Sequence, residues 1–424
     1  MPPARECFVY LQIPGSTETV LCGRFARETT RDGRNVGRFV YGRSYRARPD
    51  AVPLDPVHLP IAPTVYETAK LNGVFGALRD AAPDAWGRRV IDRIVGRHLD
   101  EVDFLLESPQ DGAGALSFGH GRVPPAPVRE FNRVLQLEEL RRAAKLLEED
   151  RPGEPVPSQI LDLLDPGSSL GGARPKNVVE DEDGLWVAKF PQRGDRWNNA
   201  PVEAAMLSLA TRCGIRVPET RVERVGDDFV LLVKRFDRER VGEDSLERSY
   251  LRHRMVSALT VLDAEDTPTD RRNWSYVLLA DELQRWSGRP RHDRAELFRR
   301  MVFNALICNV DDHPRNHALI APGRDWRLAP AYDLTPNSRQ GMEERRLAME
   351  CGRLGRVASR ENLVSQSPRF GLNPEEANGI IDEMKEIVAR SWHAEVLGQG
   401  GSERDCAVIE PAFVYPGFEY RSTP

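Results

Sequence analysis

The sequence is poor in cysteine, and its cysteines are not spaced for a disulfide framework or a metal site. The six are scattered over 424 residues without a CxxC pair, which predicts free thiols in a reducing compartment. No apolar run reaches the ~18 residues of a membrane span, and no apolar segment follows the first residues. We therefore expect a cytoplasmic protein with no membrane partner. The cysteines are Cys7, Cys22, Cys213, Cys308, Cys351 and Cys406.

A strong charge of either sign is also missing. The net charge is −5 and the pI is near 6.0, so the whole protein has no basic field that would attract nucleic acid or a membrane surface. The composition is that of an ordinary globular protein, 40% hydrophobic and 29% charged. With this length, it predicts two or three domains.

The first 60 residues alternate between apolar and polar positions in the manner of strands. Three such stretches, residues 8–13, 19–25 and 36–41, are separated by turn clusters, which predicts a small antiparallel sheet. Farther on, Pro83 and Asp84 can start a helix that the apolar side chains then pack down. On its residues alone this second segment is interpreted as structural.

A glycine-rich loop lies near the middle of the chain. Helices are expected over residues 135–149 and 158–164, with a Pro- and Gly-rich stretch between them that could act as a hinge. The loop Pro-Gly-Ser-Ser-Leu-Gly-Gly-Ala-Arg-Pro-Lys follows, and then two strands are expected over residues 177–180 and 185–190. Such a loop can fold over nucleotide phosphates while Lys189 reaches them from the second strand. An ordinary turn and a solvated lysine are the alternative.

The next stretch changes from helix to strand. Residues 202–214 predict a helix with Glu203 in its first turn, where the carboxylate either pairs with a nucleotide-binding lysine or faces the helix dipole. Strands are expected over residues 217–225 and 228–237. The segment from Lys234 to Asp237 would connect two lobes and could present backbone groups to adenine.

Beyond residue 237 the periodicity is mostly that of amphipathic helices. Strands first and helices afterwards predict an α+β protein with two lobes and a nucleotide-sized cleft between them. The helices are expected over residues 250–262, 274–286, 294–309 and 375–389.

The segment 306–337 is the richest in chemical groups. Asp311 and Asn316 follow a buried helix, and Asp333 comes after a short strand-like stretch. One carboxylate to orient an acceptor hydroxyl, with an amide and a second carboxylate as oxygen ligands for magnesium, is the set that phosphoryl transfer requires. Pro314 predicts that this segment is a loop.

Two other interpretations of this segment remain open. Asp311, Asp312 and Asn316 could simply cap the next element. Alternatively, His313 and His317 could bind zinc together with Asp311, although Pro314 separates the two histidines and no HExxH glutamate is present.

Six motifs in order make the chain resemble the HipA-family serine/threonine kinases, the toxins of bacterial type II toxin–antitoxin systems. The resemblance covers the chain up to about residue 395. The motifs are Phe75…Pro83-Asp84-x-Trp86-Gly87, Ser169-Leu-Gly-Gly-Ala-Arg-Pro-Lys176, Val187-Ala-Lys189-Phe, Lys234-Arg-Phe-Asp-Arg, Asn309-x-Asp311-x-His313-x-Arg-Asn316 and Ala331-Tyr-Asp333-Leu-Thr-Pro.

The resemblance implies an ATP- and magnesium-dependent kinase with a two-lobed kinase-like fold and a β-rich N-terminal subdomain. It implies that Asp311 is the catalytic base, that Asn316 and Asp333 hold magnesium, and that Ser169, or Ser168 beside it, is autophosphorylated to switch the kinase off. The implied ATP-binding residues are Lys189, Ser169, Gly171, Gly172, Ala173, Lys176, Lys234, Phe236 and His313. The expected domains are residues 1–105, 106–237 and 238–396, followed by a tail, 397–424, of unknown role.

The implied partners are a small helix-turn-helix antitoxin (HipB-like), which would make most of the DNA contact, and a protein substrate of the translation machinery, of the aminoacyl-tRNA synthetase class. The alternative is a catalytically idle kinase-like module that acts as a corepressor with the antitoxin. Two departures from the family pattern stand out: Arg315 replaces a lysine, and Arg174-Pro175 replaces a glutamine-glutamate pair. Arginine keeps the charge with different geometry, whereas Pro175 removes a backbone N–H that could bind phosphate.

Overall fold

The structure is a computed structural model, and it divides into two compact units. It describes residues 5–108, 111–126, 131–149, 163–164, 172, 174–242, 249–338 and 344–419. Unit 1 comprises Met1–Gln192, Lys234–Glu265 and Ile320–Trp326, and unit 2 comprises Arg193–Val233, Asp266–Leu319 and Arg327–Pro424.

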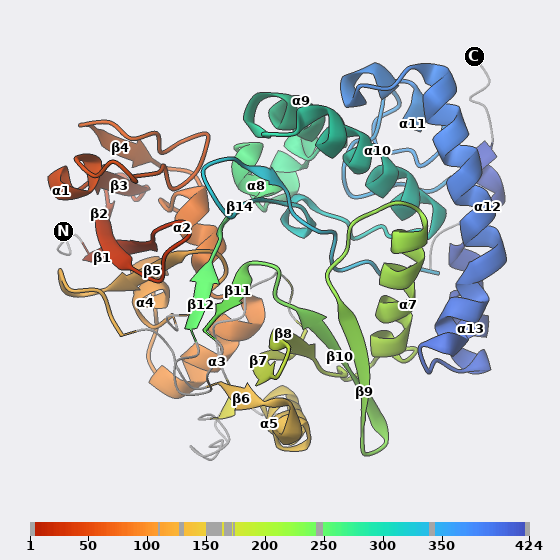
Figure 1. Ribbon diagram of the computed structural model, residues 1–424, viewed down its shortest axis with the longest axis horizontal. Helices are drawn as coiled ribbons and strands as arrows, with labels where there is room; N and C mark the ends of the chain where they lie inside the picture. The colour runs from red at the N-terminus through yellow and green to blue at the C-terminus, as the bar shows by residue number, and fades with distance from the viewer. Residues whose placement is uncertain are drawn as a thin grey trace. The chain divides into compact units, whose positions relative to one another are not determined.

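Unit 1 begins with an antiparallel sheet in the order β4-β3-β2-β1-β5 (Figure 1). The expected strands are confirmed, and alternate side chains such as Val9, Phe25 and Phe39 are buried, as the period of two requires. The strands are β1 (Arg5–Gln12), β2 (Thr19–Thr29), β3 (Asn35–Tyr41), β4 (Val65–Thr68) and β5 (Leu116–Gly119).

Short helices follow the sheet, and the expected helix start at Asp84 is confirmed. The Asp84 side chain caps helix α3 (Ala85–Val95) by accepting a 3.0 Å hydrogen bond from the Gly87 N–H. Trp86 is buried, and its indole Nε1 donates to the carbonyl of Lys176 at 3.0 Å. The helices before and after α3 are α2 (Gly76–Ala81) and α4 (Glu101–Leu106).

The middle of unit 1 carries the expected hairpin, formed by strands β7 (Lys176–Asp181) and β8 (Gly184–Lys189). Short strand β6 (Asn132–Arg133) pairs in parallel with β7 and leads through a 3₁₀ turn into helix α5 (Leu137–Glu149). Nearly all of the helix expected over residues 158–164 lies outside the described residues, as do Ser168, Ser169, Gly171 and Ala173 of the glycine-rich loop.

The helix expected over residues 250–262 is wrong. Strand β12 (Ser249–Arg252) pairs with β11 (Arg238–Val241), and strand β13 (Arg254–Ser257) leads into the single-turn helix α8 (Ala258–Val261). Pairing between distant segments overrides the local helical pattern. Gln12 accepts the backbone N–H of Arg252 and donates to the carbonyl of Tyr250, which fixes this stretch as an extended strand.

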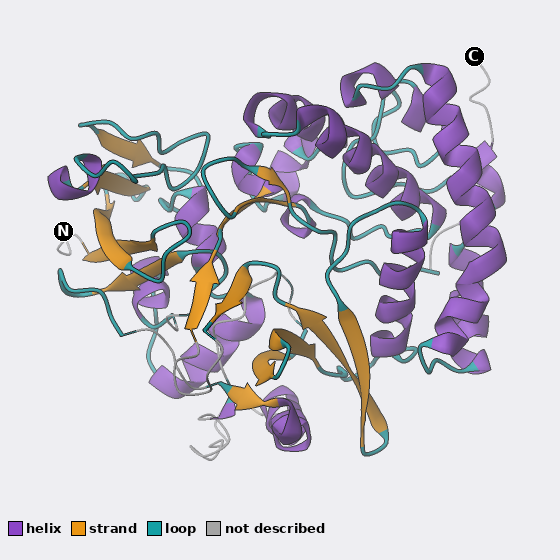
Figure 2. Ribbon diagram, in the orientation of Figure 1, coloured by secondary structure: helices purple, strands orange, loops and turns teal. Residues whose placement is uncertain are grey.

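Unit 2 is mostly helical, as Figure 2 shows by colour. The helices expected over residues 202–214, 274–286, 294–309 and 375–389 are confirmed with shifted ends, and the last of them is longer than expected. Strand β9 (Thr220–Val225) pairs with β10 (Asp228–Lys234) in an antiparallel hairpin. The helices are α7 (Asn199–Arg212), α9 (Tyr276–Trp286), α10 (Pro290–Leu306), α11 (Arg360–Val364), α12 (Pro374–Gly398) and α13 (Glu403–Ile409). Among the residues that the structure describes, no helix is long and apolar enough to cross a membrane.

The end of the chain is packed into unit 2. The backbone N–H of Val414 donates to the carbonyl of Leu306, the last residue of α10, at 2.8 Å. Phe413 stacks on Trp392 of α12 with ring centroids 4.3 Å apart. Arg345 donates to the carbonyl of Ala412 at 2.9 Å. The tail thus closes the end of α10, directly before the polar loop.

Candidate active site

The polar loop begins where helix α10 ends. Cys308 adopts a left-handed backbone with φ 55°, and the N–H of Asn309 returns to the carbonyl of Asn304 at 2.8 Å. These features end the helix and turn the chain outward. Pro314–Asn316 forms one 3₁₀ turn, so the expectation of a loop in place of a continuous helix is confirmed.

Asp312 anchors the loop through a buried hydrogen-bond network. Its side chain is 1% exposed, and its Oδ2 accepts from the hydroxyl of Tyr276, from Nδ2 of Asn304 at 2.8 Å, and from Nε2 of His317 at 2.7 Å. Asn309 donates to Asn304 at 3.0 Å and extends the network. A buried polar network with these contacts makes a loop rigid.

This support was not found from the sequence. Asp312 was considered only as a cap, but the 3₁₀ turn begins after His313 without a side-chain cap. Its partner Tyr276 lies 36 residues upstream on another helix. A sequence pattern that spans only a few residues cannot predict such a contact. The one available signal was the pair of adjacent aspartates directly after a buried helix.

Asp311, by contrast, is exposed, although protein surrounds part of its carboxyl group. Its pKa is raised above the usual value, first because of this partial burial and then because of the negative charges of Asp333 and Asp312. His313 and Arg271 oppose the rise.

Asn316 offers an oxygen that the protein leaves without a partner. The side chain is 3% exposed, its Nδ2 donates to the backbone carbonyl of Asp311 at 3.3 Å, and its Oδ1 is buried with no hydrogen-bond partner. A buried acceptor without a partner is unfavourable in a folded protein. A hard cation, which takes amide and carboxylate oxygens as ligands, would satisfy it.

Asp333 is the second candidate ligand. Its backbone is left-handed with φ 60°, a conformation that non-glycine residues rarely adopt and that is enriched at functional sites. The preceding Tyr332 donates its hydroxyl to the carbonyl of Arg315 at 2.8 Å. This bond ties the Asp333 segment to the loop that carries Asp311 and Asn316.

The zinc alternative does not form. Nε2 of His317 is occupied by Asp312, and the His313 ring packs edge-on against Trp274 with centroids 6.4 Å apart. In the described part of the chain, the one group of three possible metal ligands with mutually close atoms lies elsewhere, at His393, Glu403 and Cys406.

The described residues of the expected ATP-binding set lie in unit 1, except for His313, which lies in unit 2. Lys189 is half-buried at the end of β8, directly opposite Lys176 across the hairpin. The ammonium of Lys176 is buried and donates to Asp84 at 2.6 Å and to the carbonyl of Gly172 at 3.3 Å. Lys176 therefore joins the start of helix α3 to the base of the glycine-rich loop.

Glu203 does not lie where the sequence suggested. Helix α7 begins at Asn199, so Glu203 stands beyond the first turn and is buried. The helix-dipole interpretation is therefore wrong, because that effect is confined to the first turn.

The segment around Lys234 and Phe236 is anchored by buried charges. Asp237 accepts from Arg235 and Arg238, and both arginines also donate to Asp111. Burial alone would raise the pKa of Asp237, but the two guanidinium groups hold it far below its usual value. Lys234 lies over the Trp186 ring, 5.3 Å from its centroid, and Phe236 is half-buried. No motif or local spacing in the sequence predicts this network.

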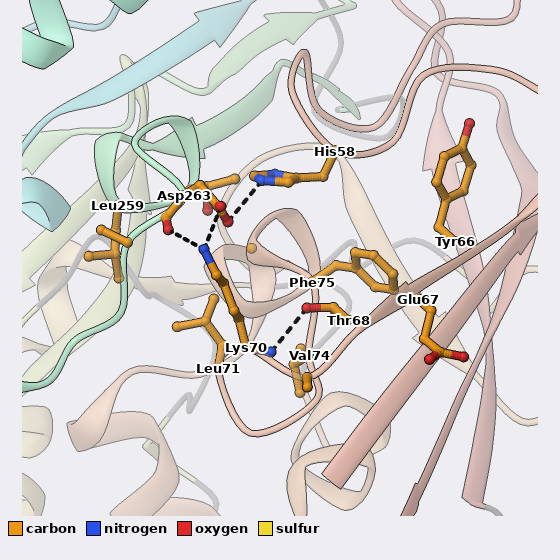
Figure 3. Close-up of a pocket in the computed structure, with 14 residues that line it drawn as sticks. His58, Tyr66, Glu67, Thr68, Lys70, Leu71, Val74, Phe75, Leu259 and Asp263 are labelled. Carbon is orange, nitrogen blue, oxygen red and sulfur yellow. Dashed lines mark hydrogen bonds and ion pairs between the residues drawn. The ribbon is translucent and has the colours of Figure 1, made fainter. Parts of the chain in front are cut away.

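A pocket of about 350 Å³ lies elsewhere in unit 1 (Figure 3). At its rim, Asp263 bonds His58 at 3.0 Å and accepts from Lys70 through its carbonyl at 2.9 Å, while Phe75 and Leu259 supply apolar walls. It is lined by none of the expected site residues, so it is distinct from the candidate active site.

Comparison with known proteins identifies this architecture. The solved Shewanella oneidensis MR-1 toxin–antitoxin complex of HipA, HipB and operator DNA contains a chain that matches with a TM-score of 0.70 at 17% identity, over 96% of this chain and 94% of that one. The protein therefore has the HipA fold. The HipA N-terminal domain model matches residues 18–119, and the HipA-like C-terminal domain model matches residues 168–392. The chain belongs to the HipA family.

Curated relatives match over shorter stretches. "Putative kinase Y4dM" of Sinorhizobium fredii (strain NBRC 101917 / NGR234) is 28% identical over 236 residues, 51% of this chain and 54% of the relative. "Putative kinase Y4mE" of the same organism is 25% identical over 214 residues, 48% of each chain. The chain thus spans about half the length of these relatives.

Proposed function

We propose that the protein is a serine/threonine protein kinase that uses ATP and magnesium and acts as a growth-arresting toxin. The observation that carries the proposal is the buried Oδ1 of Asn316, which has no hydrogen-bond partner and lies in the same loop as Asp311, whose pKa the charge of Asp333 helps to raise. Membership of the HipA family and two relatives named as kinases support it.

In the proposed reaction, a serine or threonine hydroxyl oxygen of the acceptor protein forms a bond to the γ-phosphorus of ATP. The bond from that phosphorus to the ADP oxygen breaks, and the hydroxyl proton passes to Asp311. Asn316 and Asp333 would hold magnesium, which offsets negative charge on the phosphates when bound. Lys189 would contact the phosphates from β8, and Asp312 keeps the loop in place.

The proposed regulation is autophosphorylation of the glycine-rich loop. Ser169 matches the serine of the family motif, with Ser168 next to it. A phosphate there would add negative charge to a loop that must already face the phosphates of ATP, so repulsion would displace the loop.

The proposed partners follow the solved relative, which is a complex of HipA with HipB and operator DNA. By analogy, a small helix-turn-helix antitoxin would bind this protein and make most of the DNA contact. The net charge of −5 is consistent with DNA contact that is mainly indirect. The proposed substrate is a protein of the translation machinery, of the aminoacyl-tRNA synthetase class.

The test is the intact mass of the purified chain after incubation with magnesium and ATP. Wild type, first shown to be unphosphorylated, should gain one phosphate of about 80 Da, and Asp311→Asn and Ser169→Ala should not. Asp227→Asn, an exposed aspartate in the turn between β9 and β10, is the matched control and should behave as wild type. A wild-type chain that binds ATP without gaining mass would support the idle corepressor instead.

A further inference from the structure

A cluster of three possible metal ligands lies between helices α12 and α13, and it includes none of the residues proposed for the ATP site. It comprises His393 of α12 with Glu403 and Cys406 of α13, and one ligand atom from each lies within 4.8 Å of the others. Nε2 of His393 is 3.0 Å from Oε2 of Glu403, close to the separation of two ligands on one small ion. An exposed His–Glu pair alone would be an ordinary surface contact; the buried thiol of Cys406 distinguishes this cluster.

The local sequence brings the three side chains together. Glu403 and Cys406 are three residues apart on one helix and therefore share a face. The turn before α13 is tight: Gly400 has φ 91°, and a Cβ on Gly401 would lie 2.6 Å from Cγ1 of Val396. This close approach folds α13 back onto α12 (Figure 1), beside His393.

The cluster is held in place by contacts that use other groups. Ser402 caps α13 in a capping box with Asp405, and Asp405 also accepts from the backbone N–H of Asn198 at 2.9 Å. The Asp405 carboxylate is therefore already hydrogen-bonded, and the possible metal ligands on α13 are Glu403 and Cys406. A site whose elements are fixed in advance loses little freedom when an ion binds.

We propose that His393, Glu403 and Cys406 form a zinc site with an open fourth position. Imidazole nitrogen, carboxylate oxygen and thiolate sulfur together suit Zn²⁺, whereas magnesium and calcium take oxygen ligands. The side chains of His393 and Glu403 are 47% and 75% exposed, so the ion is reached from solvent and a water molecule completes a tetrahedron. On binding, the thiol proton of Cys406 leaves to solvent. The ion then links the C-terminal tail to α12.

The test is a titration of the full-length, chelator-treated chain with Co²⁺, which reports thiolate ligation through a sulfur-to-metal charge-transfer band. One Co²⁺ should bind per chain with that band, and Zn²⁺ should displace it while excess Mg²⁺ should not. Cys406→Ser should lose the band, and His393→Gln and Glu403→Gln should each weaken binding at least tenfold, the scale seen when metal sites are altered. Cys213→Ser, another buried cysteine, is the matched control.

Two outcomes would overturn the proposal: wild type without the charge-transfer band, or Cys406→Ser, His393→Gln and Glu403→Gln that all bind like wild type. His393 and Glu403 are exposed, so their variants should fold even if Cys406→Ser does not, which circular dichroism would show. The readout is spectroscopic and needs no phosphoryl transfer, so it stands or falls separately from the kinase assay.

Discussion

Asp311 and Asp312 are adjacent in the chain but lie in opposite environments. Asp311 is exposed, and its raised pKa means that the folded state disfavours its charge. Asp312 is buried, and three side chains donate to one of its oxygens. We therefore expect Asp311 to take part in the reaction and Asp312 to stabilise the loop. Variants of Asp311 should lose activity, whereas variants of Asp312 should lose stability.

Asp312→Ala should destabilise the protein by about 3 kcal/mol, because it leaves the buried donors of Tyr276, Asn304 and His317 without an acceptor. The measurement is urea unfolding monitored by circular dichroism at pH 7. Asp227→Ala, at an exposed turn, is the control and should stay within about 0.5 kcal/mol of wild type. A stable but inactive Asp312→Ala would mean that Asp312 takes part in the chemistry, contrary to the role given to it here.

Arg271→Gln should move the acid limb of activity to higher pH. Asp311 can accept a proton only when ionised, so activity is lost as pH falls through its raised pKa. The positive charge of Arg271 lowers that pKa, so removing the charge should shift the acid limb upward, by a small amount because Arg271 is exposed to water. The measurement is kcat/KM against pH for phosphorylation of a peptide or protein acceptor.

The neighbouring Arg272→Gln is the matched control for this shift, since it removes the same charge from another exposed position. Its acid limb should match that of wild type. If activity fell at the same pH in wild type, Arg271→Gln and Arg272→Gln, ionisation of Asp311 would not determine the loss of activity at low pH. Circular dichroism across the same pH range separates loss of activity from unfolding.

At the scale of elements, the Asp84–Lys176 pair connects helix α3 to strand β7. Both side chains are nearly fully buried, 3% and 2% exposed, and Asp84 also caps α3. Asp84→Ala should destabilise the protein by about 3–5 kcal/mol, because the buried ammonium of Lys176 loses its carboxylate partner. The double variant Asp84→Ala/Lys176→Met should recover most of this loss, and chemical denaturation measures both.

Asp100→Ala is the comparison for this pair. Asp100 caps helix α4, and its ion pairs with Arg5 and Arg27 are longer and more exposed than the Asp84–Lys176 pair, so its loss should cost only about 1 kcal/mol. If Asp84→Ala cost no more than Asp100→Ala, the Lys176 contact would contribute nothing beyond the cap.

Elements governed by neighbours in the chain could be predicted from the sequence. Strands β1 to β3 follow their alternation, and α3 begins at a capping aspartate, because both signals span only a few residues. The helix expected over residues 250–262 is wrong at its start because Tyr250 and Arg252 are held extended by Gln12, more than two hundred residues away, and by pairing with β11. The candidate site shows the same difference. Its motif residues are close together in the sequence and could be predicted, whereas Tyr276 and Asp312 are 36 residues apart and their contact could not.

At the scale of the whole molecule, the C-terminal segment is a structural part of unit 2. Its backbone closes the end of α10 at Leu306, and its aromatic and aliphatic side chains are buried. Those side chains are Ile409, Phe413, Tyr415 and Phe418. The carbonyls of Pro411 and Ala412 accept from the buried guanidinium of Arg345, which would lose these acceptors without the segment.

A chain that ends at Gln399 should therefore fail to fold unit 2 stably. Burial of each large apolar side chain contributes about 1.5–3 kcal/mol, so four of them together match much of the roughly 5–15 kcal/mol that stabilises a typical protein. The measurement is soluble yield and thermal unfolding, with hydrogen exchange at Leu306 and Asn309 as a local probe. A chain that ends at Glu419 keeps every described contact and is the control. If the chain ending at Gln399 melted like that control and kept slow exchange at Asn309, the tail would be dispensable for the polar loop.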